Sequence, residues 1–188
     1  MAMGVDFPIV QIVGYQNSGK TTAAQRLIKS AAEAGFNLGT IKHHGHGGEP
    51  DGTLSSKDSH KHMQAGAAIS AVEGDGLLQF RNQKGQWTLA ELTAIYKALR
   101  SDGILIEGYK KAHYPKIVML GKQEDASLLT DLTNIVLILR ENTVEVEDPS
   151  IPVFLRDEHE KYCGWFVDFL RGGNSCTGSL LSRSRWKK

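Results

Sequence analysis

The chain has 188 residues, of which 40% are hydrophobic and 23% are charged, as is ordinary for a soluble globular protein with a substantial core. Its formal net charge of +1 gives no reason to expect a nucleic acid or an anionic membrane as a partner. No apolar run approaches the roughly 20 residues that span a bilayer, and the N-terminal residues lack the pattern of a signal peptide. We therefore expect a cytoplasmic protein.

The first expected element is an apolar strand over residues 9–13. It leads directly into Gly14-Tyr15-Gln16-Asn17-Ser18-Gly19-Lys20-Thr21-Thr22. This spelling, G-x-x-x-x-G-K-[ST] between a strand and a helix, is typical of a phosphate-binding P-loop. The two glycines let the backbone approach an anion closely, and the N–H groups of the loop and of the following helix face it. We predict that Lys20 reaches the β- and γ-phosphates of a nucleotide and that the Thr21 hydroxyl binds Mg²⁺.

Apolar residues at helical spacing predict a helix after the loop, ended by Gly35. A strand over residues 36–43 would complete a parallel βαβ unit. Residues 44–59 are rich in glycine and polar side chains, and a loop of that length inside a domain is usually functional or disordered. A short helix is expected over residues 60–66.

Two strand-like runs, 67–73 and 77–81, flank Gly74-Asp75-Gly76 and predict a β-hairpin. We expect this hairpin to be an antiparallel addition to a mainly parallel sheet. Thr88 and Glu91 have the spacing of a capping box. They open a helix that runs to residue 100, and its expected buried stripe consists of Leu89, Leu92, Ile95 and Leu99.

Further strands are expected over residues 104–107, 116–120 and 134–140, with shorter candidates at 144–147 and 152–155. The last helix should begin near Asp157 and bury Tyr162, Trp165, Phe166, Phe169 and Leu170. These elements predict one nucleotide-binding domain over residues 1–174. The basic stretch 175–188 has little to pack with, and we expect a flexible tail.

Glu107 ends a buried apolar strand, which is the Walker-B arrangement and places a carboxylate beside Mg²⁺ or its water shell. We predict that Thr21 and Glu107 hold the metal. Asp51 and Asp58 are both candidates for a second contact to Mg²⁺ or for orienting the attacking water. Asp58 is the better placed of the two, although it is equally suited to cap a helix. The predicted catalytic set is Lys20, Asp58 and Glu107.

Five of the seven histidines lie between residues 43 and 62, at His43, His44, His46, His60 and His62. Imidazole is the commonest metal ligand in proteins, so one alternative function is a metal-delivery GTPase that uses this stretch. A second alternative is a small-molecule kinase that uses the same P-loop. The Asn-Lys-x-Asp signature of guanine recognition is absent, and the motifs alone do not choose between GTP and ATP.

Taken in order, the segments VGYQNSGKTT, GTIKHHGHG, SSKDSHKHMQAGA, DGILIEGYK and PKIVML resemble the MobB family of molybdopterin-guanine dinucleotide biosynthesis proteins. The resemblance covers about residues 9 to 139. It implies an α/β, three-layer P-loop NTPase fold with a mainly parallel sheet and an added antiparallel β-hairpin. It also implies a homodimer that binds GTP and Mg²⁺ and hydrolyses GTP slowly. The implied partner is the nucleotidyltransferase MobA, which attaches GMP to molybdopterin.

Carried over to this chain, the resemblance assigns the phosphate loop to residues 14–22, the strand-end acid to Glu107 and a switch-like position to Lys57-Asp58-Ser59. Related P-loop proteins often have a lysine where this chain has Tyr15. Slow hydrolysis agrees with the sequence, because no arginine is obviously placed as a finger, a group that contributes about 10³–10⁵ in rate in other P-loop enzymes.

Overall fold

The computed structural model describes residues 7–43, 57–83, 85–147 and 150–172. The chain divides into two compact units, one formed by Met1–His43 with Tyr96–Lys188 and the other by His44–Ile95. The expected single domain over 1–174 stays a prediction, and the expected tail at 175–188 lies outside the described residues.

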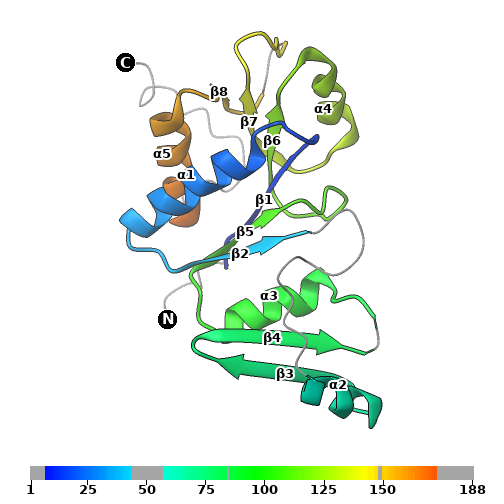
Figure 1. The fold of residues 1–188 in the computed structure, drawn as a ribbon. Helices are drawn as coiled ribbons and strands as arrows, with labels where there is room; N and C mark the ends of the chain where they lie inside the picture. The colour runs from blue at the N-terminus through cyan, green and yellow to red at the C-terminus, as the bar shows by residue number, and fades with distance from the viewer. Residues whose placement is uncertain (1–6, 44–56, 84, 148–149, 173–188) are drawn as a thin grey trace. The chain divides into compact units, whose positions relative to one another are not determined.

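The first unit contains a six-stranded sheet in which every neighbouring pair is parallel (Figure 1). The strand order across it is β2-β5-β1-β6-β7-β8. In chain order the strands are β1 (Ile9–Gly14), β2 (Leu38–Lys42), β5 (Gly103–Glu107), β6 (Lys116–Leu120), β7 (Ile135–Arg140) and β8 (Val153–Leu155). Because all six run the same way, their carboxyl ends lie along one edge of the sheet, which is where open α/β sheets bind ligands.

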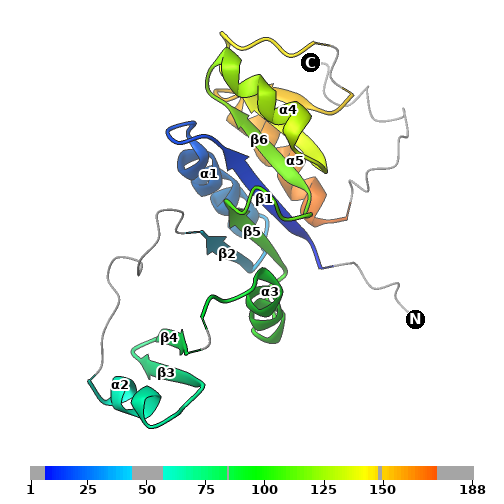
Figure 2. The ribbon, with the colours of Figure 1, turned by 90° about the vertical axis from the view of Figure 1, so that its right-hand side faces the viewer.

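Two hydrophobic cores cover the two faces of this sheet. Neighbouring strand residues alternate between them: Ile12 and Ile117 belong to one, Val13 and Val118 to the other. Helices α1 (Lys20–Glu33) and α5 (His159–Leu170) lie side by side over the first face (Figures 1 and 2). On the second face, Leu128 belongs to α4 (Leu128–Asp131), which directly follows the short 3₁₀ helix η1 (Gln123–Ser127).

The second unit contains α2 (Lys57–Gln64) and a separate antiparallel sheet of β3 (Ile69–Gly74) and β4 (Leu77–Asn82), followed by most of α3 (Leu89–Ala98). Asp75 and Gly76 both have positive φ, +50° and +77°, as a two-residue hairpin turn of the Asp-Gly type requires. The hairpin exposes apolar side chains at Ile69, Leu77, Leu78 and Phe80.

The α/β fold with a mainly parallel sheet and an antiparallel hairpin is confirmed, and the hairpin forms a sheet of its own. The capping box is also confirmed, since the Thr88 N–H donates to Glu91 (2.8 Å) and the Glu91 N–H to the Thr88 hydroxyl (3.2 Å). The expected strand at 144–147 is wrong, because Val144 turns into the second core while its neighbours form no ladder. Leu99 is 63% exposed rather than buried, because α3 ends at Ala98.

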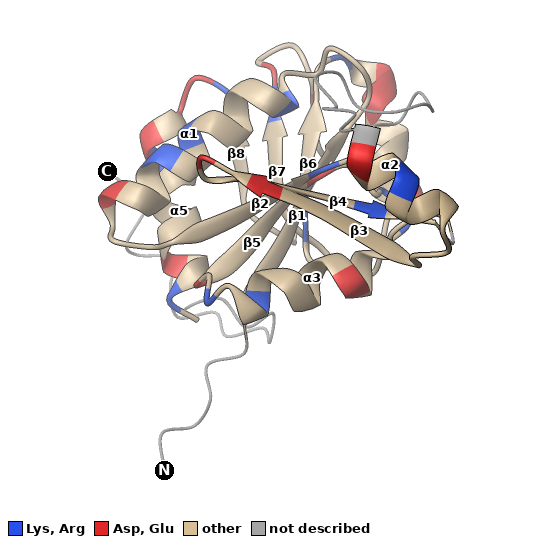
Figure 3. Cartoon of the chain, turned by 60° about the horizontal axis from the view of Figure 1, so that its bottom comes forward, with Lys and Arg blue, Asp and Glu red and all other residues tan. Residues whose placement is uncertain are grey.

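Lysines and arginines alternate with acidic residues over the helices and loops, while the central strands carry few charges (Figure 3). None of the helices in the described ranges combines the length and apolar character that a bilayer span requires.

Candidate functional site

The loop between β1 and α1 depends on two glycines. A Cβ at Gly14 would lie 2.9 Å from both the Cβ and the carbonyl oxygen of Met119 on β6. Gly19 has a φ of +84°, in the region that glycine enters at little cost. The loop can therefore pass close against β6 and turn straight into α1, whose first N–H groups have no acceptor within the helix.

The remaining predicted loop residues lie around this turn. Ser18 is buried, whereas Tyr15, Gln16, Asn17 and Thr22 are exposed. Asn17 also has a positive φ, +61°, a conformation that asparagine tolerates better than most residues. The sequence motif thus corresponds to a compact loop with its polar side chains at the carboxyl edge of the sheet.

The Lys20 side chain folds back over this loop. Its Nζ donates to the Tyr15 carbonyl oxygen at 2.5 Å and lies 3.5 Å from the Ser18 hydroxyl. Burial lowers the pKa of Lys20 below its ordinary value; the negative charge of Glu107 opposes the shift, and the positive charges of Lys110 and Lys42 add to it. The amine therefore lies between positively and negatively charged side chains. An anion bound there would favour its charged form.

Thr21 and Glu107, the two predicted metal ligands, contact each other. The Thr21 hydroxyl donates to the Glu107 carboxylate, with Oγ1 at 3.1 Å from Oε1 and 3.4 Å from Oε2. The contact joins the first turn of α1 to the end of β5, which is the strand paired with β1. Hydroxyl and carboxylate oxygens are the hard ligands that Mg²⁺ prefers, so this donor set fits the ion.

The loop between β5 and β6 is anchored by two buried polar side chains. The amide of Gln11, on β1, donates to the carbonyl oxygens of Gly108 (2.9 Å) and Tyr109 (2.8 Å). Lys116, only 1% exposed, donates through Nζ to the carbonyl oxygens of Ala112 (2.5 Å) and Tyr114 (3.1 Å). The spacing of the IEGYK and PKI segments therefore has a physical basis, because the lysine of the second segment fixes the loop that follows the first.

This anchored loop brings a positive charge to the edge of the site. Lys110 places its Nζ 4.1 Å from the centre of the Tyr15 ring, a cation–π geometry. A lysine is thus present beside Tyr15, although it comes from a different element than in P-loop proteins that carry it within the loop itself.

Asp58 belongs to the second unit. It is exposed on α2, and its carboxylate lies 3.0 Å from the Nζ of Lys61. Its predicted catalytic role stays a prediction, and Asp51 lies outside the described residues.

His44 and His46 also lie outside the described residues. His43 packs against Tyr109 with the ring centres 4.3 Å apart, while His60 and His62 are exposed on α2. Within the described ranges, no group of three or more His, Cys, Asp or Glu side chains is arranged to hold a metal ion.

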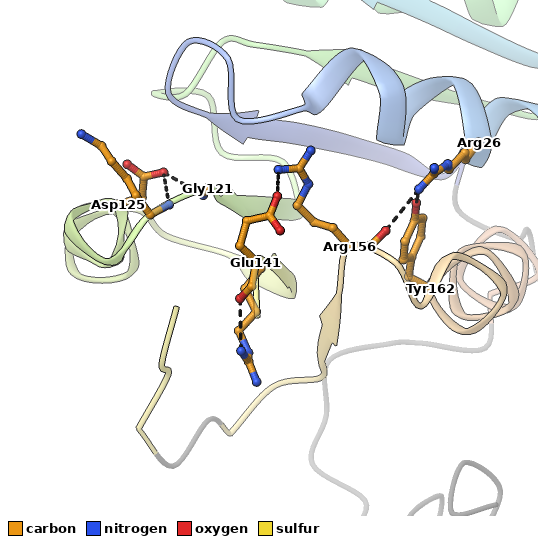
Figure 4. Close-up of polar contacts among 8 residues, drawn as sticks. Arg26, Gly121, Asp125, Glu141, Arg156 and Tyr162 are labelled. Atoms are coloured by element: carbon orange, nitrogen blue, oxygen red, sulfur yellow. Dashed lines mark hydrogen bonds and ion pairs between the residues drawn. The ribbon is translucent and has the colours of Figure 1, made fainter. Parts of the chain in front are cut away.

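The sequence did not reveal an ion pair on the other side of the glycine loop. Arg156 and Glu141 follow β8 and β7 and pair through Nη1 and Oε1 (Figure 4). The Arg156 guanidinium also lies so close to Gly19 that a Cβ there would collide with it. Arg26, on α1, donates to the Arg156 carbonyl oxygen (3.1 Å) and to the Tyr162 hydroxyl (3.2 Å).

The family model described as "Molybdopterin guanine dinucleotide synthesis protein B" matches residues 9–141. This chain belongs to the MobB family. One relative, described as a "Probable molybdopterin-guanine dinucleotide biosynthesis adapter protein" from Bacillus subtilis, is 46% identical over 158 residues, which are 84% of this chain and 91% of that protein. An Escherichia coli adapter protein of the same pathway is 30% identical over 122 residues, 63% of this chain and 69% of that protein.

Solved structures of the MobB family share the fold. The crystal structure of Bacillus subtilis MobB has a TM-score of 0.68 at 41% identity, and the match covers 91% of this chain and all of that one. The MobB homologue from Bacillus stearothermophilus also has a TM-score of 0.68, at 34% identity, with 87% of this chain and 98% of that one covered.

Proposed function

We propose that this chain is a GTP-binding adapter protein of molybdopterin-guanine dinucleotide biosynthesis that hydrolyses GTP slowly with Mg²⁺. Membership of the MobB family supports the pathway. The observation that carries the nucleotide part is the contact between Thr21 and Glu107, 3.1 Å between hydroxyl and carboxylate oxygens. It brings two hard oxygen ligands from separate elements to the mouth of the glycine loop.

In this proposal, the glycine loop binds the phosphate chain through its N–H groups and the positive end of α1. Lys20 leaves the Tyr15 carbonyl and donates to the terminal phosphates. Thr21 and Glu107 would hold Mg²⁺, which would neutralise phosphate charge. Burial and the charges of Lys110 and Lys42 disfavour the charged amine of Lys20, and a polyanion bound beside it would favour the charged form.

Hydrolysis is slow in this proposal because a finger arginine would have to stand at the terminal phosphate, on the Glu107 side of the loop. Arg156 reaches the loop at Gly19 from the opposite side, where β7 and β8 end, and it pairs with Glu141. A partner protein can supply the missing positive charge in trans. We propose the nucleotidyltransferase MobA as that partner, with this chain assisting the transfer of GMP without carrying it out. The compartment would be the cytoplasm, where GTP is made.

A homodimer is part of the proposal. The β3–β4 hairpin leaves Ile69, Leu77, Leu78 and Phe80 between 44% and 52% exposed, and apolar side chains gathered on one small sheet are typical of a surface that associates. A second copy of the chain is the occupant we propose. Light scattering should give twice the monomer mass for the parent and the monomer mass for a Leu78→Glu variant. A monomeric parent protein would refute the dimer.

Calorimetric titration with GTP and ATP, with and without Mg²⁺, tests the nucleotide assignment. The parent and a Lys29→Ala control, changed at an exposed lysine on α1, should bind GTP equally well. Lys20→Ala should lose binding while retaining the parent's melting temperature. If Lys20→Ala binds GTP as tightly as the parent, the loop is not the phosphate site.

The partnership needs a separate experiment. Immobilised MobA should retain the parent protein, and retention should respond to GTP. Absence of retention with and without nucleotide would remove MobA from the proposal and leave the nucleotide site standing.

A further inference from the structure

The side of the glycine loop away from Glu107 is occupied by charged residues that the proposed mechanism does not use. The order β5-β1-β6-β7-β8 places Glu107 on one side of β1 and the ends of β7 and β8 on the other. Glu141 and Arg156 directly follow those two strands, at the same carboxyl edge of the parallel sheet. The loop is therefore flanked by an acid on one side and by an arginine on the other.

The main chain of Arg156 is fixed on both sides of its Cα. Its N–H donates to the Arg140 carbonyl oxygen at 3.0 Å, extending the β7–β8 ladder. Its own carbonyl oxygen accepts from Arg26 on α1 at 3.1 Å. The Arg156 side chain is consequently attached to main chain that is held between the sheet and α1, the helix that follows the glycine loop.

The guanidinium is directed at the loop and is only partly screened from water. It lies against Gly19, so that a Cβ there would force the guanidinium to move, while 30% of the Arg156 side chain and 40% of the Glu141 side chain remain exposed. Water reaches both members of this ion pair, which reduces its contribution to stability. Its position is better explained by a ligand that shares the guanidinium than by a structural role.

We propose that Arg156 is a second phosphate-binding cation of this site and that it contacts the phosphate nearest the nucleoside. The inference rests on the proposed nucleotide binding. If the metal and the terminal phosphates lie toward Glu107, the phosphate chain extends its nucleoside end toward the side where β7 and β8 end. A guanidinium at Gly19 then meets the phosphate that carries the ribose, and its planar fork suits two phosphate oxygens.

Glu141 has a defined part in this proposal. It pairs with Arg156 and keeps the guanidinium beside the loop. When nucleotide binds, phosphate oxygens compete with that carboxylate for the same N–H groups. Glu141 therefore holds Arg156 in place and at the same time opposes its transfer to the ligand, and removing its charge favours the bound state.

The test is calorimetric titration at one fixed salt concentration with GTP, GDP and pyrophosphate as probes. Arg156→Ala should weaken GTP and GDP by the same factor, about tenfold or more for a charged hydrogen-bonding group, and pyrophosphate by much less. Arg156→Lys should recover only part of the loss, because an ammonium cannot offer two parallel donors. Glu141→Gln should bind both nucleotides severalfold more tightly.

Arg171→Ala is the matched control, since Arg171 also pairs with an acid, Asp168, at 3.7 Å on α5. It should leave every affinity unchanged. Melting temperatures of all variants establish that they are folded; if Arg156→Ala does not fold, Arg156→Lys and Glu141→Gln carry the test.

Three results would overturn the proposal. The first is an Arg156→Ala variant that binds GTP and GDP like the control. The second is an Arg156→Ala variant that loses as much affinity for pyrophosphate as for GTP and GDP, which would place the guanidinium at the phosphates far from the nucleoside. The third is weaker binding by Glu141→Gln. Failure of the parent protein to bind any nucleotide would instead refute the proposed function itself.

Discussion

Lys116→Met gives the sharpest test of how the site is held together. Lys116 is 1% exposed at the start of β6, and burial lowers the pKa of its amine below the ordinary value. Methionine has a similar length and keeps the apolar contacts, but it removes both hydrogen bonds to the loop between β5 and β6.

The expected loss follows from those two bonds. Hydrogen bonds from a charged donor contribute about 1.5–3 kcal/mol each, so two give about 3–6 kcal/mol. The lowered pKa means that desolvation of the ammonium offsets part of this gain. The two carbonyl groups lie in a partly exposed loop and regain water in the variant. We therefore expect Lys116→Met to lose about 1–3 kcal/mol of unfolding free energy at pH 7.

The pH dependence makes this prediction specific. Between the lowered pKa of the folded protein and the ordinary value of about 10.5, the unfolded chain binds more protons at this lysine than the folded one. Stability then rises with pH over that window. The unfolding free energy of the parent should rise with pH because of Lys116, and that of the Lys116→Met variant should lack this rise. The difference in unfolding free energy between the two proteins should therefore widen from neutral pH toward pH 10.5.

Urea unfolding at several pH values measures this difference, with Lys29→Met as the control because Lys29 is exposed on α1. The control should show neither the loss nor the widening. A Lys116→Met protein as stable as the parent at pH 7, or a difference that narrows as the pH rises, would refute the reasoning.

Two further predictions concern the glycine loop. Nucleotide affinity should fall at alkaline pH as Lys20 loses its proton. Glu107→Gln should move this fall to lower pH and Lys110→Gln to higher pH, because the two side chains shift the pKa of Lys20 in opposite directions. Titrations across pH that gave the same shift for both variants would contradict this. Gly19→Ala and Gly35→Ala should each lose about 1–2 kcal/mol of unfolding free energy, measured by thermal unfolding, because both glycines have a positive φ that alanine adopts with strain. Since open space surrounds Gly35, only Gly19→Ala should also weaken nucleotide binding, and equal affinities would count against the crowding at Gly19.

Short sequence patterns predicted those parts of the fold that depend on residues close together in the chain. The strand and helix around Gly14 and Gly19 follow from short-range spacing, and so do the capping box at Thr88 and the strand that ends in Glu107. Short continuous apolar runs likewise predicted the positions of the central strands, and the glycines at residues 74–76 predicted the hairpin.

The missed features depend on contacts between distant parts of the chain. Arg156 follows a short strand that the sequence predicts at 152–155, but the place of that strand at the edge of the sheet beside β7 depends on distant pairing, so nothing nearby marks Arg156 as part of the site. The partners of Lys116 are main-chain carbonyl groups, which have no sequence signature. Leu99 has helical spacing, but the helix ends one residue before it.

The pairing of β1 has a consequence for the order in which the protein forms during synthesis. Both neighbours of β1 in the sheet come from far along the chain, with Ile9 opposite Ile104 and Gln11 opposite Lys116. Contacts of such long sequence separation form late, whereas the hairpin of β3 and β4 needs only adjacent residues. A ribosome must release the chain beyond β6 before the glycine loop acquires its supports. The nascent protein therefore cannot complete the strands that flank its glycine loop until about half of the first unit has been made.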